Sequence, residues 1–195
     1  MSEEEKDKRK EAVKEQQANY WIEERYEIIE GVRYDFLSSP RVTHQMLVTE
    51  LYASIRSTCH ANGIVLVAPM DVHFDENNIV QPDLIFIANE NLHIIKDGWV
   101  KGVPDLLVEI LSPSTGSKDK VRKKIIYERF GVKEYWIVDP LYSTIDQLVL
   151  VDGKYRLEAS YGDEDTFTSP NLTCISIDLR QLFQEAMRFN EHTAE

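Results

Sequence analysis

Short apolar runs separated by turn-forming residues cover most of the chain, a pattern typical of β-strands. The predicted strands span residues 26–31, 32–37, 64–74, 79–88, 105–111, 134–138, 145–151 and 154–159. Glu30-Gly31 and Asp152-Gly153 fall between consecutive strands and predict hairpin turns. Residues 105–111, DLLVEIL, are almost all apolar, which indicates a central strand covered on both faces of its sheet.

Longer stretches with a period near 3.6 residues predict helices. The first is expected to start at Ser39-Pro40, with serine as the cap and proline in the first turn, and to end near His60. Its apolar face carries His44, Leu47, Val48, Leu51, Ile55 and Cys59. A second helix is expected from about Lys118 to Gly131, and a third over about Leu179–Phe189. This order of elements predicts a mixed α+β fold, with helices flanking a central mixed sheet and an extra hairpin near each end.

The predicted organisation is one domain with short flanking segments. Residues 1–18 are rich in acidic and basic side chains and are expected to form a charged tail or helix. Residues 19–190 are expected to form a single domain, because no linker or repeat divides them, and residues 191–195 a C-terminal tail. No apolar run reaches the roughly 20 residues needed to cross a bilayer, and the charged start lacks the apolar part of a secretion signal. We therefore expect a cytoplasmic protein without membrane spans.

The charge balance restricts how the protein could bind nucleic acid. A formal net charge of -12 argues against binding over the whole surface, because phosphate contacts need clustered Lys and Arg. A bound metal ion or a local basic patch remains compatible with this charge. The second helix offers one such patch, made of Lys118, Lys120, Arg122, Lys123, Lys124 and Arg129. The two cysteines, Cys59 and Cys174, are expected to be reduced thiols that pack as small apolar groups.

Two carboxylates are candidates for a metal site. Glu109 interrupts the apolar run at 105–111, where an ionised carboxylate is costly unless it is paired or binds a metal. The alternative is that Glu109 lies at the edge of the strand or takes part in a structural ion pair. Asp83 follows Pro82 at the start of another predicted strand, although Pro-Asp alone is typical of turns. If the two strands are neighbours, both carboxylates reach one point, and such oxygen ligands suit Mg²⁺ or Mn²⁺.

A lysine would complete this site, and the candidate is Lys123. The position two residues after Glu109 is Leu111, so the strand itself supplies no lysine. On the second helix, Lys123 falls on the apolar side together with Ile126, Tyr127 and Phe130. A lysine facing such neighbours should have an acidic partner or a lowered pKa. The alternative is an apolar stem that extends its amine into water.

Several segments together carry a family resemblance. They are YEIIEG at 26–31, QPDL at 81–84, PDLLVEILSPST at 104–115, Asp119-x-x-x-Lys123-x-x-x-Tyr127, and GVKEYWIVDP at 131–140. In this order they resemble the Uma-two family of restriction-endonuclease-like proteins. The resemblance implies the PD-(D/E)XK nuclease fold, with Asp83 and Glu109 as acidic site residues. It also implies that the active-site lysine has moved from the strand to the helix, at Lys123.

Two accessory residues are weaker candidates. His44 lies near the start of the first helix, and a histidine in this region is frequent in the family that the chain resembles. It could approach the metal site or a phosphate, or it could be a satisfied, partly buried histidine. Glu30 could line the same cleft, or it could simply belong to the turn at Gly31.

The expected function is metal-dependent hydrolysis of phosphodiester bonds in nucleic acid, most plausibly DNA, with Asp83, Glu109 and Lys123 as catalytic residues. One alternative is a catalytically silent binding or regulatory module that keeps the nuclease fold. Another is a hydrolase acting on a small phosphorylated substrate. A homodimer is also expected, because sheet edges such as Ile145–Val151 invite pairing with a second chain.

Overall fold

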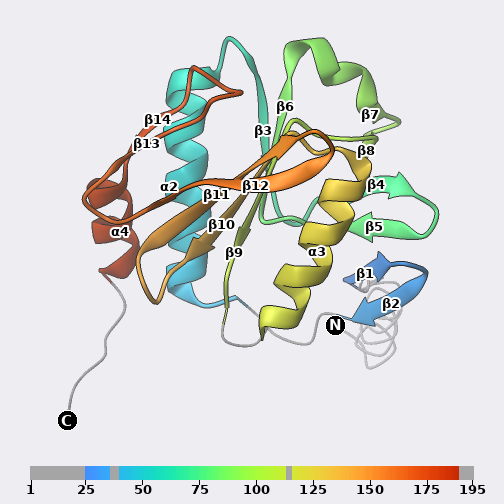
Figure 1. Cartoon of the computed structure of the whole chain (residues 1–195), viewed down its shortest axis with the longest axis horizontal. Helices are drawn as coiled ribbons and strands as arrows, with labels where there is room; N and C mark the ends of the chain where they lie inside the picture. Colours follow the sequence, from blue (N-terminus) through green and yellow to red (C-terminus); the bar gives the residue numbers. More distant parts are fainter. Residues whose placement is uncertain (1–24, 36–39, 113–115, 189–195) are drawn as a thin grey trace, which may run out of the picture.

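The computed structural model describes residues 25–35, 40–112 and 116–188, with side chains described from residue 121 onward in the last segment (Figure 1). The expected tails, at 1–18 and 191–195, lie outside these ranges. Most of the strands form two six-stranded sheets. The central sheet has the strand order β12-β11-β10-β9-β6-β3, and the second sheet has the order β2-β1-β5-β4-β8-β7.

The central sheet consists of β3 (Gly63–Val67), β6 (Leu84–Ala88), β9 (Leu106–Ile110), β10 (Glu134–Asp139), β11 (Thr144–Val151) and β12 (Lys154–Tyr161). The second sheet consists of β1 (Tyr26–Ile29), β2 (Val32–Asp35), β4 (Val72–Asp75), β5 (Asn78–Val80), β7 (Ile95–Lys96) and β8 (Trp99–Lys101). The remaining elements are α2 (Val42–Cys59), the 3₁₀ helix η1 (Asn89–Ile94), α3 (Gly116–Phe130), β13 (Thr166–Thr168), β14 (Ser176–Asp178) and α4 (Leu179–Met187).

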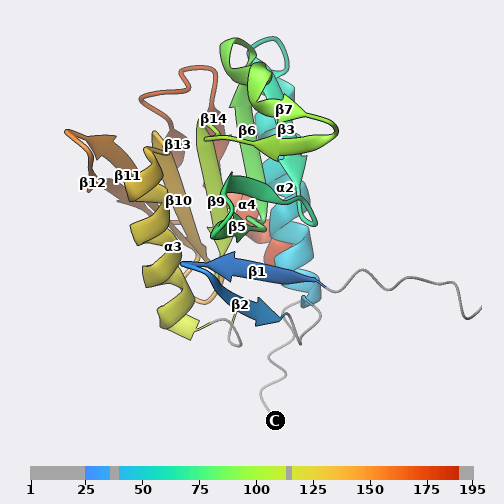
Figure 2. The ribbon, with the colours of Figure 1, turned by 90° about the vertical axis from the view of Figure 1, so that its right-hand side faces the viewer.

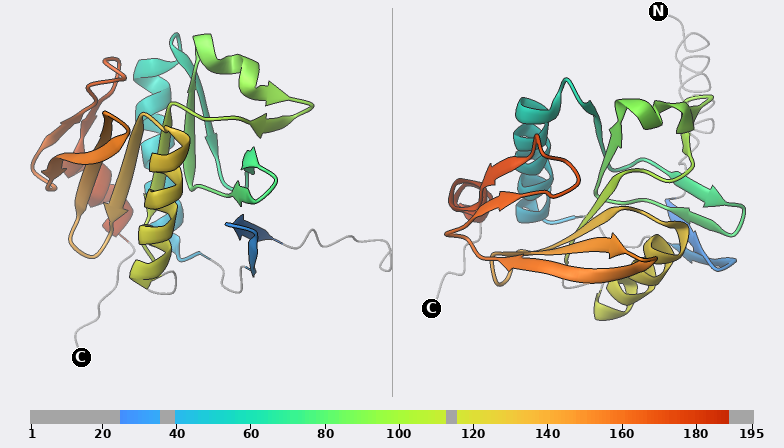
Figure 3. Two further views of the ribbon diagram at one scale, coloured as in Figure 1. Left: turned by 45° about the vertical axis from the view of Figure 1, so that its right-hand side comes forward. Right: turned by 45° about the horizontal axis from the view of Figure 1, so that its top comes forward.

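The central sheet separates two apolar cores. Helices α2 and α4 pack on one face, and α3 and the second sheet pack on the other (Figures 2 and 3). Strands β9 and β10 run parallel in the middle of the sheet, with Glu109 opposite Ile137. Neighbouring residues of β10 alternate between the cores, so that Trp136 enters the α2 side and Tyr135 the α3 side. The predicted mixed α+β fold with a central mixed sheet is therefore confirmed.

The two long strands predicted at 64–74 and 79–88 are four short ones. The first breaks at Ala68–Asp71, around Pro69, and the second breaks at Gln81–Asp83, around Pro82. Proline has no backbone N–H to donate to a sheet, so each proline ends one strand. Beyond the breaks the chain changes sheet: β3 pairs with β6 in the central sheet, and β4 pairs with β5 in the second sheet.

Other boundaries differ from the predicted ones in smaller ways. Helix α2 starts at Val42 rather than at Ser39-Pro40, because Arg41 keeps an extended backbone and is the N-cap. Residues 89–103, to which no element was assigned, contain η1 and the hairpin of β7 and β8. The hairpin of β13 and β14 was not predicted. None of the described helices has the length and apolarity needed to span a bilayer.

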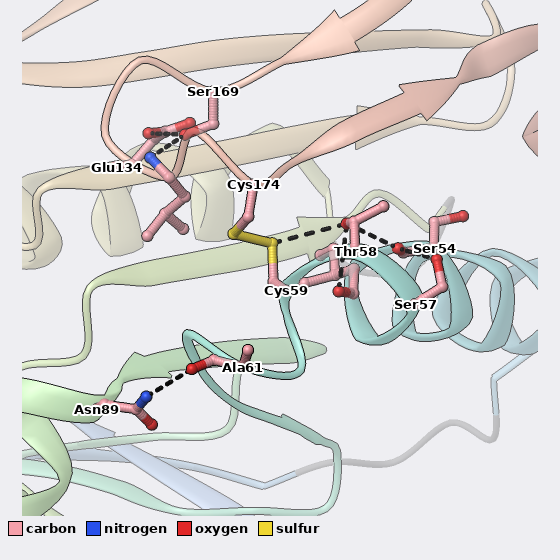
Figure 4. The surroundings of a disulfide bond; sticks show 11 residues. Ser54, Ser57, Thr58, Cys59, Ala61, Asn89, Glu134, Ser169 and Cys174 are labelled. Atoms are coloured by element: carbon pink, nitrogen blue, oxygen red, sulfur yellow. Dashed lines mark hydrogen bonds between the residues drawn. A yellow bond between two sulfur atoms is a disulfide. The ribbon is translucent and has the colours of Figure 1, made fainter.

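The prediction of two reduced thiols is wrong, because Cys59 and Cys174 form a disulfide with their Cα atoms 5.2 Å apart (Figure 4). Cys59 ends α2, and Cys174 lies in the loop between β13 and β14. Both belong to the core on the α2 side, where Cys59 is fully buried. A sequence separation of 115 residues gave no spacing signal for this pairing.

A buried carboxylate also anchors this C-terminal loop. Glu134 on β10 is fully buried and accepts four hydrogen bonds. Its Oε1 accepts from Trp136 Nε1 at 2.6 Å and from Gln147 Nε2 at 2.7 Å. Its Oε2 accepts from Ser169 Oγ at 2.7 Å and from Asn171 Nδ2 at 3.1 Å. These four donors are neutral groups and satisfy both oxygens, so the buried carboxylate is tolerated.

Candidate active site

Asp83 and Glu109 belong to neighbouring segments of the central sheet, because β6, which follows Asp83, pairs with β9, which contains Glu109. Strand β6 pairs with β9 in antiparallel register, with Leu84 opposite Val108. Asp83 immediately precedes β6 at the point where the chain leaves the second sheet, and its Oδ2 accepts a hydrogen bond from the Ile110 N–H at 2.7 Å. The Asp83 carboxylate is therefore tied to the residue that follows Glu109. Both side chains are mostly buried, with exposed fractions of 16% and 14%.

Lys123 reaches this place from α3. Its Nζ lies 2.9 Å from Glu109 Oε1 and 2.7 Å from Glu27 Oε1. The Lys123 side chain is only 8% exposed, so the amine does not extend into water, as the alternative interpretation proposed. One amine therefore bridges two buried carboxylates that come from different sheets.

Sequence reasoning missed Glu27. It lies on β1 and is 6% exposed, and its Oε1 also accepts a hydrogen bond from the Gln81 N–H at 2.8 Å. Glu27 and Ile29 are the two buried residues of β1, because alternate side chains of a strand face the same side. That alternation could have indicated an inward-facing carboxylate.

Sequence reasoning assigned Tyr127 only to helix packing. Its hydroxyl donates to Glu109 Oε1 at 2.7 Å, so this oxygen accepts from both Lys123 and Tyr127. The two donors lie four residues apart on α3, and this spacing places them on one face of the helix. The second oxygen, Glu109 Oε2, makes no hydrogen bond within the described part of the chain.

Of the two accessory candidates, His44 contacts the acidic residues and Glu30 does not. His44 Nε2 lies 3.2 Å from Asp83 Oδ1, and the ring is 14% exposed. Glu30 is an exposed turn residue with φ of 52°, and it pairs with Arg129 at 3.2 Å. The turn interpretation of Glu30 therefore fits the structure, and His44 belongs to the candidate site.

Burial and the concentration of carboxylates shift the proton affinities of this site. Burial raises the pKa of Glu109 to about 7, where Lys123 opposes the shift and Asp83 and Glu27 add to it. Burial alone would lower the pKa of the Lys123 amine, but Glu109 and Glu27 outweigh it and hold this pKa above its usual range. Burial likewise works against a charged His44, yet the hydrogen bond to Asp83 leaves its pKa raised.

The six basic residues expected to form one patch do not all share a surface. Lys123 faces inward, and Arg129 is held by Glu30. Arg122 is exposed, and its guanidinium lies over the ring of Tyr34. The side chains of residues 116–120, which include two of the lysines, lie outside the described residues. Successive helical residues point about 100° apart, so consecutive basic residues diverge around the helix.

The oxygen atoms of Asp83 and Glu109 are of the kind that could coordinate a divalent cation. Carboxylate oxygens are the ligands that Mg²⁺ and Mn²⁺ prefer, and Mg²⁺ keeps several of its waters beside one or two carboxylates. Glu109 Oε2 has a free acceptor position, as described above. No group of three or more His, Cys, Asp or Glu side chains within the described ranges is arranged to hold a metal ion. The fit therefore concerns a two-carboxylate site completed by water.

A central mixed sheet, with one acid on β9 paired with a helical lysine and a second acid just before the adjacent strand β6, is the arrangement expected of the restriction-endonuclease-like fold. The family model Uma2, described as "Putative restriction endonuclease", matches residues 17–180. The chain belongs to this family.

Among solved structures, the chain is similar to a protein from Anabaena variabilis described as a "putative nuclease belonging to DUF820". The TM-score is 0.68 at 17% sequence identity, over 89% of this chain and 98% of that one. At this identity the similarity establishes the fold. A search of curated proteins gives no match.

Proposed function

We propose that this protein is a nuclease that hydrolyses phosphodiester bonds of DNA with the help of Mg²⁺ or Mn²⁺. The observation that carries the proposal is that Glu109 contacts the buried Lys123 amine, while Asp83 accepts a hydrogen bond from the N–H of the residue next to Glu109. Membership of a restriction endonuclease family supports the same chemistry. The acidic pair is only partly exposed, so substrate must approach along the side where these carboxylates reach the surface.

Each residue of the site has a distinct part in this proposal. Asp83 and Glu109 would hold the cation, which when bound lowers the pKa of a water and polarises the phosphate. His44 and the Ile110 N–H each donate to one oxygen of Asp83, and this fixes the plane of its carboxylate. Lys123 stays protonated and supplies fixed positive charge for the phosphorane-like transition state.

The exposed basic residues of α3 are the proposed contacts with the nucleic-acid backbone. Arg122 is exposed, and its guanidinium lies over the ring of Tyr34, 5.2 Å from the ring centroid. Contacts with phosphates weaken as salt rises, because each one releases counterions from the nucleic acid. Changing Arg122 to Gln should therefore weaken DNA binding and reduce its salt dependence, without changing the chemistry at Glu109.

The decisive experiment compares matched variants in a cleavage assay. Glu109→Gln should abolish cleavage of plasmid and linear DNA with Mg²⁺ or Mn²⁺, whereas Glu158→Gln, on an exposed position of β12, should not. Circular dichroism would verify that both variants are folded. Cleavage by folded Glu109→Gln at the wild-type rate would remove this carboxylate from the mechanism. Parallel assays on RNA test the choice of DNA.

A silent binding module is the second candidate, favoured by the net charge of -12 and by the closed Glu27–Lys123–Glu109 network. Such a module would bind nucleic acid or a partner without cutting it. Wild-type protein that binds DNA in a mobility-shift assay, yet shows no cleavage with several divalent ions, would favour this candidate over the nuclease.

The cellular location and the oligomeric state can both be tested by experiment. We propose a cytoplasmic location, where disulfides are uncommon, so non-reducing mass spectrometry of the Cys59–Cys174 pair from cells is informative. The strand expected to offer a free edge, Ile145–Val151, lies in β11 and is paired on both sides. The outer strands of the central sheet are β12 and β3. Light scattering after size-exclusion chromatography tests the predicted homodimer.

A further inference from the structure

Several buried polar atoms have no hydrogen-bond partner, and some of them belong to residues of the candidate active site or next to it. In the part of the chain that the structure describes, they are His44 Nδ1, His73 Nε2, Gln81 Oε1 and the Tyr135 hydroxyl. His44 and Gln81 contact Asp83 and Glu27 directly. An unpaired buried polar group is destabilising, so most such groups in proteins have a partner, a bound water or a function.

Tyr135 is the most informative member of this group. It is fully buried on β10, on the α3 face of the central sheet, and is two residues before Ile137, the partner of Glu109 across the strands. Its ring packs edge-to-face against Tyr127, with ring centroids 5.0 Å apart. The Tyr127 hydroxyl in turn donates to Glu109. Tyr135 therefore packs against Tyr127, which contacts Glu109 directly.

The Tyr135 hydroxyl must act as a hydrogen-bond donor. Burial raises its pKa well above the ordinary value, and the nearby carboxylates, with Glu109 the strongest, add to that shift. The other donors of the site already have carboxylate acceptors: Lys123 and Tyr127 donate to Glu109, and His44 lies against Asp83. Of these four residues, Tyr135 is the one whose side chain makes no hydrogen bond at all to the described residues.

The burial of Tyr135 limits the size of any group that can accept a hydrogen bond from its hydroxyl. Because Tyr135 has 0% exposure, a nucleotide phosphate has no direct access to its hydroxyl, whereas a water molecule fits into small internal spaces. An internal water needs at least two polar partners. Glu109 Oε2 is the candidate for the second: Tyr135 and the partner of Glu109, Ile137, lie on the same face of β10, and Oε2 makes no hydrogen bond to the described residues.

We propose that the Tyr135 hydroxyl holds an internal water against Glu109 and thereby acts as a positioning residue for this carboxylate. Glu109 is then oriented through both oxygens: directly by Lys123 and Tyr127 at Oε1, and through the water at Oε2. The structural part of this proposal stands by itself, and its consequence for cleavage and metal binding rests on the proposed nuclease function.

The test compares Tyr135→Phe with Tyr155→Phe. The Tyr155 hydroxyl donates to the Val132 carbonyl at 2.9 Å, so its removal should lower thermal stability and leave the site unchanged. Tyr135→Phe removes an unpaired hydroxyl and should keep its stability. It should lower kcat, with KM for DNA unchanged, and weaken Mn²⁺ binding by about tenfold, as loss of a group supporting a metal ligand commonly does.

High-resolution crystal structures supply the readout that is independent of activity. The wild type should show an ordered water within hydrogen-bonding distance of both Tyr135 Oη and Glu109, and Tyr135→Phe should lose it. Absence of that water in the wild type, or Mn²⁺ affinity of Tyr135→Phe equal to that of the wild type, would overturn the proposal. A wild type that cuts no DNA counts against the nuclease function alone, and the crystallographic outcome still decides the role of Tyr135.

Discussion

Lys123 Nζ lies 2.7 Å from Glu27 and 2.9 Å from Glu109, so one buried amine neutralises two carboxylates that belong to different sheets. The three groups together carry one net negative charge when all are ionised. Asp83, which immediately precedes the neighbouring strand β6, adds another. In the proposed nuclease this excess of negative charge would attract a cation.

Lys123→Met should destabilise the protein as well as inactivate it. Removal of the amine leaves Glu27 and Glu109 buried without a partner, which costs about 3–5 kcal/mol of unfolding free energy for buried ion pairs. Chemical denaturation measures this loss, with Lys124→Met as the control on the next residue of α3. Because the freed carboxylates would bind a cation, Mn²⁺ should stabilise Lys123→Met more than the wild type. A variant as stable as the wild type would contradict the buried bridge.

Affinity for divalent ions should increase with pH up to about 7 and then level off. Burial and the neighbouring carboxylates raise the pKa of Glu109 to about 7, so below that value a proton occupies the proposed ligand. Metal binding must displace this proton, and affinity should fall by up to about tenfold for each pH unit below the pKa. Calorimetry in buffers of different ionisation enthalpy measures both affinity and proton release. Wild-type affinity that is independent of pH would argue against Glu109 as the ligand.

Glu134→Gln should loosen the C-terminal loop without touching the candidate site. Glutamine keeps the shape, but its amide NH₂ replaces one carboxylate oxygen and faces two of the four donors, and the charge-assisted hydrogen bonds are lost, at a cost of about 2–3 kcal/mol. Thermal and urea unfolding measure the change, and hydrogen exchange around Ser169–Asn171 should accelerate. The exposed Glu158→Gln variant serves again as the control, with little expected effect.

The Cys59–Cys174 disulfide should contribute substantially to stability. It closes a loop of 115 residues, and loss of a native disulfide typically lowers the unfolding free energy by about 2–5 kcal/mol. Unfolding of the Cys59→Ala/Cys174→Ala variant, compared with that of the wild type with and without a dithiol, measures the contribution. If the dithiol leaves wild-type stability unchanged and mass spectrometry shows two free thiols, the bond is absent in solution.

Local patterns predicted those parts of the fold and site that depend on single elements. The apolar strand around Glu109 and the helical position of Lys123 both followed from periodicity, and the structure brings these two side chains together. The catalytic roles assigned to them remain predictions. The turn at Asp152-Gly153 was also predicted from the residue pair, and the structure confirms it: both residues adopt the positive φ that such a turn requires.

Features that depend on how distant segments meet were not predictable from one sequence. Glu27 joins Lys123 only because the second sheet docks against α3, and that docking depends on where the chain changes sheet at Pro69 and Pro82. Apolar periodicity continues across both prolines, so pattern alone suggested uninterrupted strands. The disulfide likewise depends on tertiary packing between α2 and a loop far away in the sequence.

The placement of Asp83 at the change of sheet has a consequence for assembly of the protein. Its backbone carbonyl accepts from the Ala68 N–H on one connection, and its side chain accepts from Ile110 on the central sheet. Glu27, meanwhile, is held by the neighbouring Gln81 N–H. In a chain that had folded only its central sheet, Glu27 would not yet contact Lys123. The connection between the two sheets that holds the Asp83 backbone would not yet be formed either. The complete acidic arrangement is therefore a property of the finished fold, and a partly folded chain does not yet contain it.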